Sequence, residues 1–140
     1  MTEGFELHPQ LAADSYPIVA WPLCEVRLIK DANYPWLILV PQRAGLRDFD
    51  ELSPAEMSVA GSEIRAASQA LRTLYRPDKL NVAALGNQVP QLHIHVIARF
   101  EGDVAWPKPV WGVAPAKPYQ SEEDERVVVL KEALTGSVEI

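Results

Sequence analysis

Two of the three histidines in this chain stand one residue apart in the segment QLHIHVIARF, residues 91–100. His93 and His95 fall on one side of this stretch together with Gln91, while apolar residues occupy the other side. Successive side chains of a strand point to opposite faces, so the pattern predicts a strand with two imidazoles side by side on one face. Imidazole titrates near neutral pH and can act as a nucleophile, a proton carrier or a metal ligand.

Three interpretations of this histidine pair are open from the residues alone. The pair can decorate a solvent-exposed sheet face. It can share a metal ion, but that needs a third ligand, and the remaining histidine, His8, is far away in the sequence, so we expect no metal site. It can carry phosphoryl or nucleotidyl transfer, in which one neutral imidazole attacks phosphorus and its neighbour stabilises the charge. The turn over residues 86–89 offers backbone N–H groups and amides to phosphate oxygens and supports this third interpretation.

The stretch GNQVPQLHIHVIAR, residues 86–99, resembles the signature of the histidine-triad (HIT) family, and the wider resemblance covers roughly residues 20–102. In that family three histidines alternate with apolar residues after a Gly-Gln-Ser/Thr-Val turn. The resemblance implies that His93 attacks an α-phosphate and becomes transiently nucleotidylated, and that His95 supports the phosphate and its proton traffic. Gln91 stands at the first triad position, so the triad is Q-x-H-x-H. A glutamine can help to orient the phosphate but cannot titrate.

Five further residues are expected to contact the substrate. Asn87 stands where the family has the glutamine of its turn, and Gln88 and Val89 complete the same turn. Asp31 lies near the position at which some family members carry an asparagine for the ribose, and we expect it to accept from sugar hydroxyls. Arg99 shares the face of the histidines and is the nearest sequence candidate for a phosphate contact.

The rest of the chain predicts an α+β domain that positions these residues. Strands are expected over residues 24–30, 35–41, 79–85 and 91–100. A long helix is expected over residues 53–75, because Ser53, Pro54 and Glu56 form a capping-box start and an apolar stripe follows at helical spacing. We therefore expect a HIT-like fold with an antiparallel sheet of about five strands crossed by one long helix.

The two ends of the chain are expected to flank this core. A short helical turn is predicted after Pro9, ending before Pro17. Residues 103–140 form an extension rich in Trp and Pro, in which Trp106 and Trp111 are expected to pin the tail to the body. A final helix is predicted over residues 121–134 with Ser121 as its N-cap. The whole of 1–140 is expected to be a single domain with its common core at about 20–102.

The composition of the chain limits the kinds of partner and the cellular location that we expect. A net charge of −6 argues against a general nucleic-acid or anionic-membrane binder but does not exclude a small anionic ligand in a local cluster of donors. Cys24 is the single cysteine and cannot form an internal disulfide. We find no signal-peptide pattern at the N-terminus and no apolar run of membrane-spanning length, so a cytoplasmic location is expected.

The function implied by the resemblance is hydrolysis or transfer at a nucleoside α-phosphate, through cleavage of a phosphoanhydride or phosphoramidate bond. No cofactor is required for this chemistry, and Mg²⁺ is expected only as a companion of a polyphosphate substrate. The family also implies a homodimer acting on a small nucleotide. Two alternatives stay open: a nucleotide-binding module that lost turnover with the first histidine, and a metal-binding protein.

Overall fold

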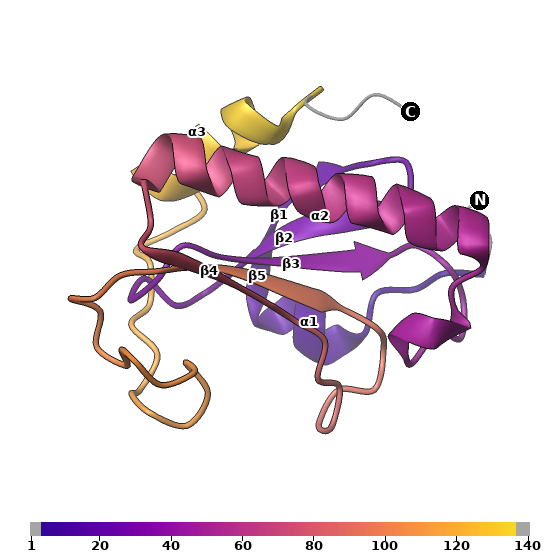
Figure 1. Cartoon of the computed structure of the whole chain (residues 1–140), viewed down its shortest axis with the longest axis horizontal. Helices are drawn as coiled ribbons and strands as arrows, with labels where there is room; N and C mark the ends of the chain where they lie inside the picture. The colour runs from indigo at the N-terminus through magenta and orange to yellow at the C-terminus, as the bar shows by residue number, and fades with distance from the viewer. Residues whose placement is uncertain (1–3, 137–140) are drawn as a thin grey trace.

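The computed structural model describes residues 4–136 and has the predicted α+β fold. Five antiparallel strands form one sheet in the order β1-β2-β3-β5-β4, and one long helix lies across it (Figure 1). In chain order the elements are α1 Pro9–Ala13, β1 Ser15–Ala20, β2 Cys24–Ile29, β3 Trp36–Pro41, the 3-10 turn η1 Phe49–Glu51, α2 Pro54–Tyr75, β4 Lys79–Ala83, β5 Ile94–Arg99 and α3 Glu125–Leu134.

Helix α2 begins and ends as its sequence predicts. The Ser53 hydroxyl accepts from the backbone N–H of Glu56 at 3.1 Å, and the Glu56 carboxylate accepts from the Ser53 N–H at 2.9 Å. Pro54 occupies the first helical position, where no backbone donor is needed. The helix stops at Arg76, which adopts a left-handed conformation with φ of 50° before Pro77. These signals fix the long helix that covers one face of the sheet.

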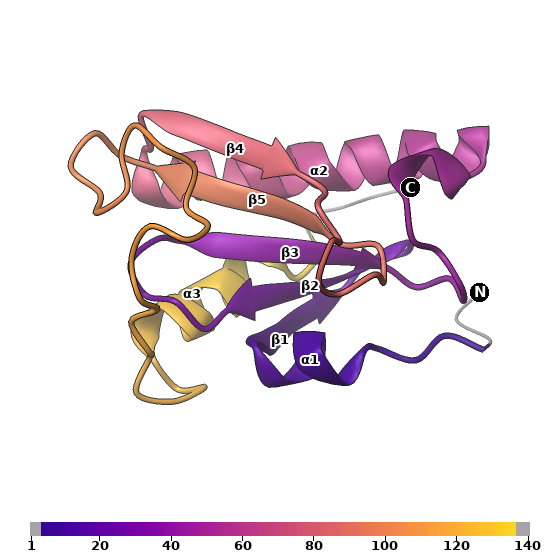
Figure 2. The same cartoon turned by 90° about the horizontal axis from the view of Figure 1, so that it is seen from below.

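The sheet buries side chains on both faces, which explains the nearly continuous apolar sequence of β3. Leu92, Ile94, Val96 and Ala98 pack in the cluster that contains the buried faces of α2 and α3. Trp36 and its neighbours pack in a second cluster on the opposite face, with residues from α1 and from the C-terminal extension. Figures 1 and 2 show this layering, with α2 and α3 on one side and α1 on the other.

The N-terminal region contributes a strand that was not predicted. Residues 9–13 form the expected short helix, but the chain then continues as β1, which pairs with β2 at the edge of the sheet. Pro17 lies within β1, next to a register irregularity between Pro17 and Val19. An edge strand tolerates proline because one row of its backbone groups has no ladder partner. Pro17 therefore lies in an edge strand and does not end the regular secondary structure of this region.

Three element boundaries also differ from the prediction. Strand β5 begins at Ile94 instead of residue 91, because the Leu92 N–H donates to Leu46 O at 3.0 Å and leaves the ladder. Strand β4 ends at Ala83 instead of residue 85. Helix α3 begins at Glu125 with Asp124 as its N-cap, whereas Ser121 accepts from the N–H of Glu123 in the preceding turn.

The C-terminal extension is part of the folded body. Asp103 follows β5, and its carboxylate pairs with Arg99 at 2.8 Å, with both side chains 3% exposed. Val110 and Ala105 are buried in the cluster around Trp36. Among residues 4–136, no helix is both long and apolar enough to cross a bilayer.

Candidate active site

The two histidines lie together at the start of β5 and are buried. His95 is on the strand and His93 immediately precedes it, with ring centroids 4.9 Å apart in an edge arrangement. Their exposed fractions are 7% for His93 and 5% for His95. The interpretation that the pair decorates a solvent-exposed face is therefore wrong, and two buried, adjacent imidazoles need a structural or chemical reason.

The hydrogen bond of His93 determines which of its nitrogens is free. Its Nδ1 lies 2.7 Å from the backbone oxygen of Gln91, and a carbonyl oxygen can only accept, so Nδ1 carries the proton. Burial lowers the pKa of His93, the Gln91 carbonyl raises it in part, and the charge of His8 lowers it further; the net direction is downward. At neutral pH the Nε2 of His93 consequently holds an unprotonated lone pair.

His95 has the opposite tautomer. The indole N–H of Trp36 donates to His95 Nδ1 at 2.9 Å, which leaves the proton on Nε2. Burial, followed by the charge of His93, lowers the pKa of His95 to about 3. Trp111 also packs edge-on against the ring, with centroids 5.0 Å apart. His95 is thus a neutral hydrogen-bond donor beside a neutral imidazole that carries a lone pair on Nε2.

Both histidines line a cavity of about 600 Å³, called the larger cavity below. Of the substrate-contact residues predicted from the sequence, Asp31, Asn87, Gln88 and Val89 line this cavity together with the histidines. Apolar walls come from α1, β2, β3 and the C-terminal extension, and the residues concerned are Leu11, Ile29, Trp36, Val110 and Trp111. An apolar concavity with a few convergent polar groups is the usual form of a small-molecule site.

The turn that leads to the histidines forms part of the cavity wall. Gly86 has φ of +77°, a conformation that residues with a Cβ rarely adopt. Asn87, Gln88 and Val89 follow it and line the cavity.

Asp31 serves the fold as well as the cavity. It is 6% exposed, and its Oδ1 accepts from the backbone N–H of Asn33 at 3.0 Å and of Lys117 at 3.2 Å. This carboxylate therefore holds the β2–β3 turn and the C-terminal extension at one end of the larger cavity.

Gln91 and Arg99 are placed differently from the expectation. The Gln91 amide oxygen accepts from the His8 N–H at 2.8 Å, and its amide nitrogen donates to Glu6 O at 2.8 Å. Both ends of this side chain thus hold the N-terminal segment, and Gln91 is not among the residues that line the cavity. Arg99 is 2% exposed, does not line the cavity either, and donates to Asp103 and Asn81.

Two tryptophans in the site were not identified from the sequence as site residues. Trp36 could have been considered because an indole N–H in an apolar segment usually finds an acceptor when it is buried. Trp111 packs onto the body as predicted, but the surface on which it packs is His95 and Trp36, with the two indole centroids 5.9 Å apart.

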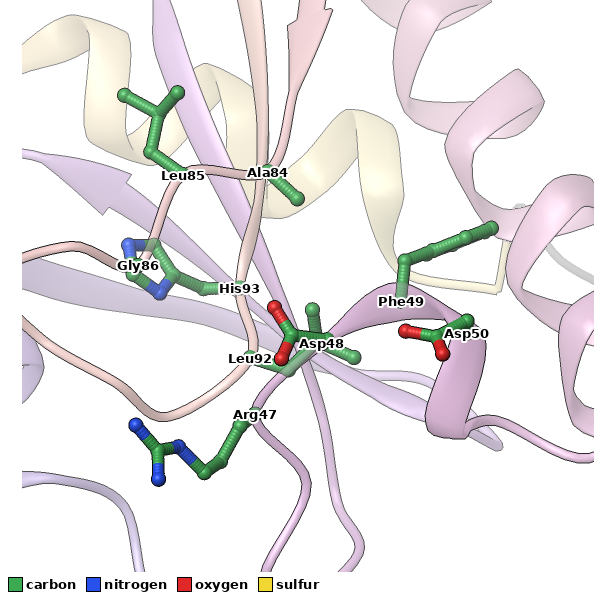
Figure 3. Close-up of a pocket in the computed structure, with 9 residues that line it drawn as sticks. All are labelled: Arg47, Asp48, Phe49, Asp50, Ala84, Leu85, Gly86, Leu92 and His93. Carbon is green, nitrogen blue, oxygen red and sulfur yellow. The ribbon is translucent and has the colours of Figure 1, made fainter.

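A second cavity, of about 350 Å³ and called the smaller cavity below, opens on His93 from the side of the η1 turn. Figure 3 shows its lining, which is Arg47, Asp48, Phe49, Asp50, Ala84, Leu85, Gly86, Leu92 and His93. Leu85, Gly86 and His93 line both cavities. Within the described residues 4–136, no cluster of three His, Cys, Asp or Glu side chains could hold a metal ion.

This fold, with a histidine pair at the start of β5 behind a glycine turn, defines a HIT protein, and comparison with known proteins agrees. The family model of the HIT domain matches residues 10–102, and the chain belongs to this family. HIT proteins are typically nucleotide hydrolases or transferases. No curated protein matches the chain.

Three solved structures of histidine triad proteins are similar over nearly their whole length. The protein from Bradyrhizobium japonicum is 44% identical, with 93% of this chain and 98% of that chain covered and a TM-score of 0.88. The protein from Sinorhizobium meliloti is 42% identical, with 96% and 100% covered and a TM-score of 0.89. The protein from Marinobacter aquaeolei is 44% identical, with 96% and 98% covered and a TM-score of 0.88.

Proposed function

We propose that this protein cleaves a phosphoanhydride or phosphoramidate bond at a nucleoside α-phosphate, by hydrolysis or transfer, through a covalent nucleotidyl intermediate on His93. The observation that carries the proposal is the pair of opposite tautomers: His93 presents a lone pair at Nε2, and His95 presents a proton at Nε2. Both groups line one cavity and have pKa values below the ordinary range. A nucleophile and a hydrogen-bond donor at neighbouring positions are what displacement at phosphorus requires.

The reaction proceeds in two displacements. The lone pair of His93 Nε2 attacks the α-phosphorus in line, and the bond to the leaving group breaks with its electron pair on the leaving atom. The N–H of His95 donates to a phosphoryl oxygen and stabilises the charge that develops there. Water then attacks phosphorus, loses a proton to solvent, and displaces His93, which returns to its neutral form. The product is a nucleoside monophosphate.

The nucleoside is assigned to the larger cavity. Its apolar walls at Ile29, Val110 and Trp111 suit the face of a base, and the proposal gives Asp31, which lines the same cavity, the role of accepting from ribose hydroxyls. The turn at Asn87 supplies polar groups beside the histidines for the phosphate. A divalent ion enters this scheme only as the counter-ion of a polyphosphate substrate. The homodimer and the cytoplasmic location that the family implies remain part of the proposal.

One observation favours a second candidate, a nucleotide-binding module without turnover. Gln91 occupies the first triad position, and its amide is committed to the N-terminal segment rather than to the phosphate. A protein of this kind keeps the pocket and binds nucleotides but forms no covalent intermediate.

The experiment that separates the candidates follows AMP release from an adenosine phosphoramidate and from a diadenosine polyphosphate. Wild type is compared with His93→Ala, and intact mass after rapid quenching reports an added nucleoside monophosphate. We expect turnover and the adduct in the wild type and neither in His93→Ala. His8→Asn is the matched control: it removes the one histidine outside both cavities and keeps a side chain that can cap α1. The charge of His8 is the smallest of the three causes that shift the pKa of His93, so this variant should keep both turnover and the adduct. AMP binding by wild type and His93→Ala without any turnover would favour the binding module.

A further inference from the structure

His93 lies at the boundary between two cavities. The larger cavity extends from the ring toward Asp31 and Trp111. The smaller one extends toward residues 47–50, which lead into and begin η1 (Figure 3). Leu85 and Gly86 line both cavities together with His93. The two cavities therefore meet at His93, where the proposed function puts the phosphorus.

A double displacement at phosphorus retains one group and exchanges the other. One group, here the nucleoside, stays bound while its phosphate is attached to His93. The other group is exchanged, because the leaving group departs in the first step and an acceptor takes its place in the second. The larger cavity, of about 600 Å³, has the volume and the apolar walls for the retained nucleoside. The smaller cavity, of about 350 Å³, is then left for the group that is exchanged.

The charges of the smaller cavity indicate which groups it accepts. Its lining carries two carboxylates, Asp48 and Asp50, and one guanidinium, Arg47. In Figure 3 the Asp48 carboxylate points toward the side of His93, while the Arg47 guanidinium lies at the lower edge of the view. The excess of carboxylates disfavours an anionic group such as a phosphate and favours a group that carries a positive charge.

The turn that presents these side chains is held in place. The Glu51 carboxylate accepts from the backbone N–H of Arg47 at 2.8 Å and of Asp48 at 2.7 Å. These backbone hydrogen bonds lower the pKa of Glu51. Phe49 and Leu85 add exposed apolar surface to the same cavity, with exposed fractions of 36% and 48%. An amine on a short apolar arm matches this combination of carboxylates and apolar walls.

We propose that the smaller cavity is the subsite for the group exchanged at the His93-bound phosphate, and that Asp48 and Asp50 make it select cationic over anionic groups. This inference rests on the proposed function. When the leaving group is an amine, the P–N bond breaks with its electron pair on nitrogen, which takes a proton from solvent. The nucleoside phosphate remains on His93 until water attacks.

The test compares three AMP phosphoramidates that differ only in the arm on nitrogen. One carries a 2-aminoethyl arm, one a 2-carboxyethyl arm, and one has no arm. The measured quantity is the ratio of kcat/KM for the amine arm to kcat/KM for the carboxylate arm. We expect this ratio to exceed one in the wild type and to fall by about tenfold in Asp48→Asn/Asp50→Asn, the effect of two exposed charge pairs. Asparagine retains the capping ability of position 48.

A charge-matched control is available on another surface. Glu122→Gln/Glu123→Gln removes the same charge from two exposed residues that precede α3, and its ratio should equal that of the wild type. Asp50→Asn alone, which leaves Asp48 in place, should give an intermediate ratio. An equal ratio in wild type and Asp48→Asn/Asp50→Asn, with the armless substrate cleaved, overturns the subsite and leaves the proposed function intact. No cleavage of any of the three by wild type overturns both.

Discussion

Burial of His95 in a neutral form should make the folded protein sensitive to mild acid. Its pKa is about 3 in the folded protein, against an ordinary value of 6.5. Between these two values the unfolded chain binds a proton that the folded chain does not, so the free energy of unfolding falls as the pH falls below 6.5. At pH 5, about 1.5 pH units below the ordinary pKa, this single group costs about 2 kcal/mol. The lowered pKa of His93 acts in the same direction.

The assay is urea unfolding at pH 7 and pH 5 of wild type and His95→Gln. Glutamine does not titrate, and its amide oxygen can accept the N–H of Trp36 in place of the imidazole. Between pH 7 and pH 5 the wild type should lose about 2 kcal/mol more of its free energy of unfolding than the variant. The carboxylates common to both proteins cancel in this difference.

An equal loss in the two proteins would refute the reasoning. It would mean that His95 takes up a proton at pH 5 while the protein stays folded. The neutral Nε2–H donor, on which the proposed role of His95 depends, would then not persist below neutral pH. Following the His95 ring by NMR during the same titration gives the pKa directly.

Two further changes test other contacts of the site and its support. Trp36→Phe removes the N–H that fixes the His95 tautomer. The kcat for AMP release should fall by about five- to tenfold, which is the effect of one neutral hydrogen bond. Steady-state kinetics should show this fall while AMP binding stays unchanged, and an unchanged kcat would contradict the role given to the Trp36 N–H. Asp103→Ala leaves the Arg99 guanidinium buried without its carboxylate and should destabilise the fold by about 3–5 kcal/mol in chemical denaturation. Asp103→Asn still offers an acceptor oxygen and should lose less of the free energy of unfolding. A loss below about 1 kcal/mol in Asp103→Ala would show that the Arg99–Asp103 pair is solvated in solution.

The ionised Asp103 carboxylate stabilises the fold at neutral pH because its hydrogen bonds lower its pKa. Burial alone raises its pKa, but hydrogen bonds from Arg99 and from the backbone N–H groups of Phe100, Trp106 and Ala105 outweigh burial and lower the pKa to about 2. Because the folded pKa is below the ordinary value of 3.8, its contribution is present above pH 4 and is lost as the pH falls toward 2.

Local signals were sufficient for most of the fold. The capping box at Ser53 and the helical apolar spacing predicted α2 to within one residue. The β2–β3 hairpin followed from two apolar runs around a turn. Strand β1 was missed because proline usually ends a local pattern, and only pairing with β2 at the sheet edge shows why Pro17 is tolerated.

The sequence by itself determined that His93 and His95 lie side by side, since residues at alternate positions of an extended segment share a face. The glycine turn before them is equally local. Only the tertiary structure decided the chemical state of each ring, because burial, the Trp36 N–H and the Trp111 ring come from segments far apart in the chain. It also separated Arg99 from the cavity and placed the η1 turn beside His93. The hydrogen-bond partners and the burial of a side chain depend on which distant segments pack against it. The spacing of residues along one strand does not specify those segments.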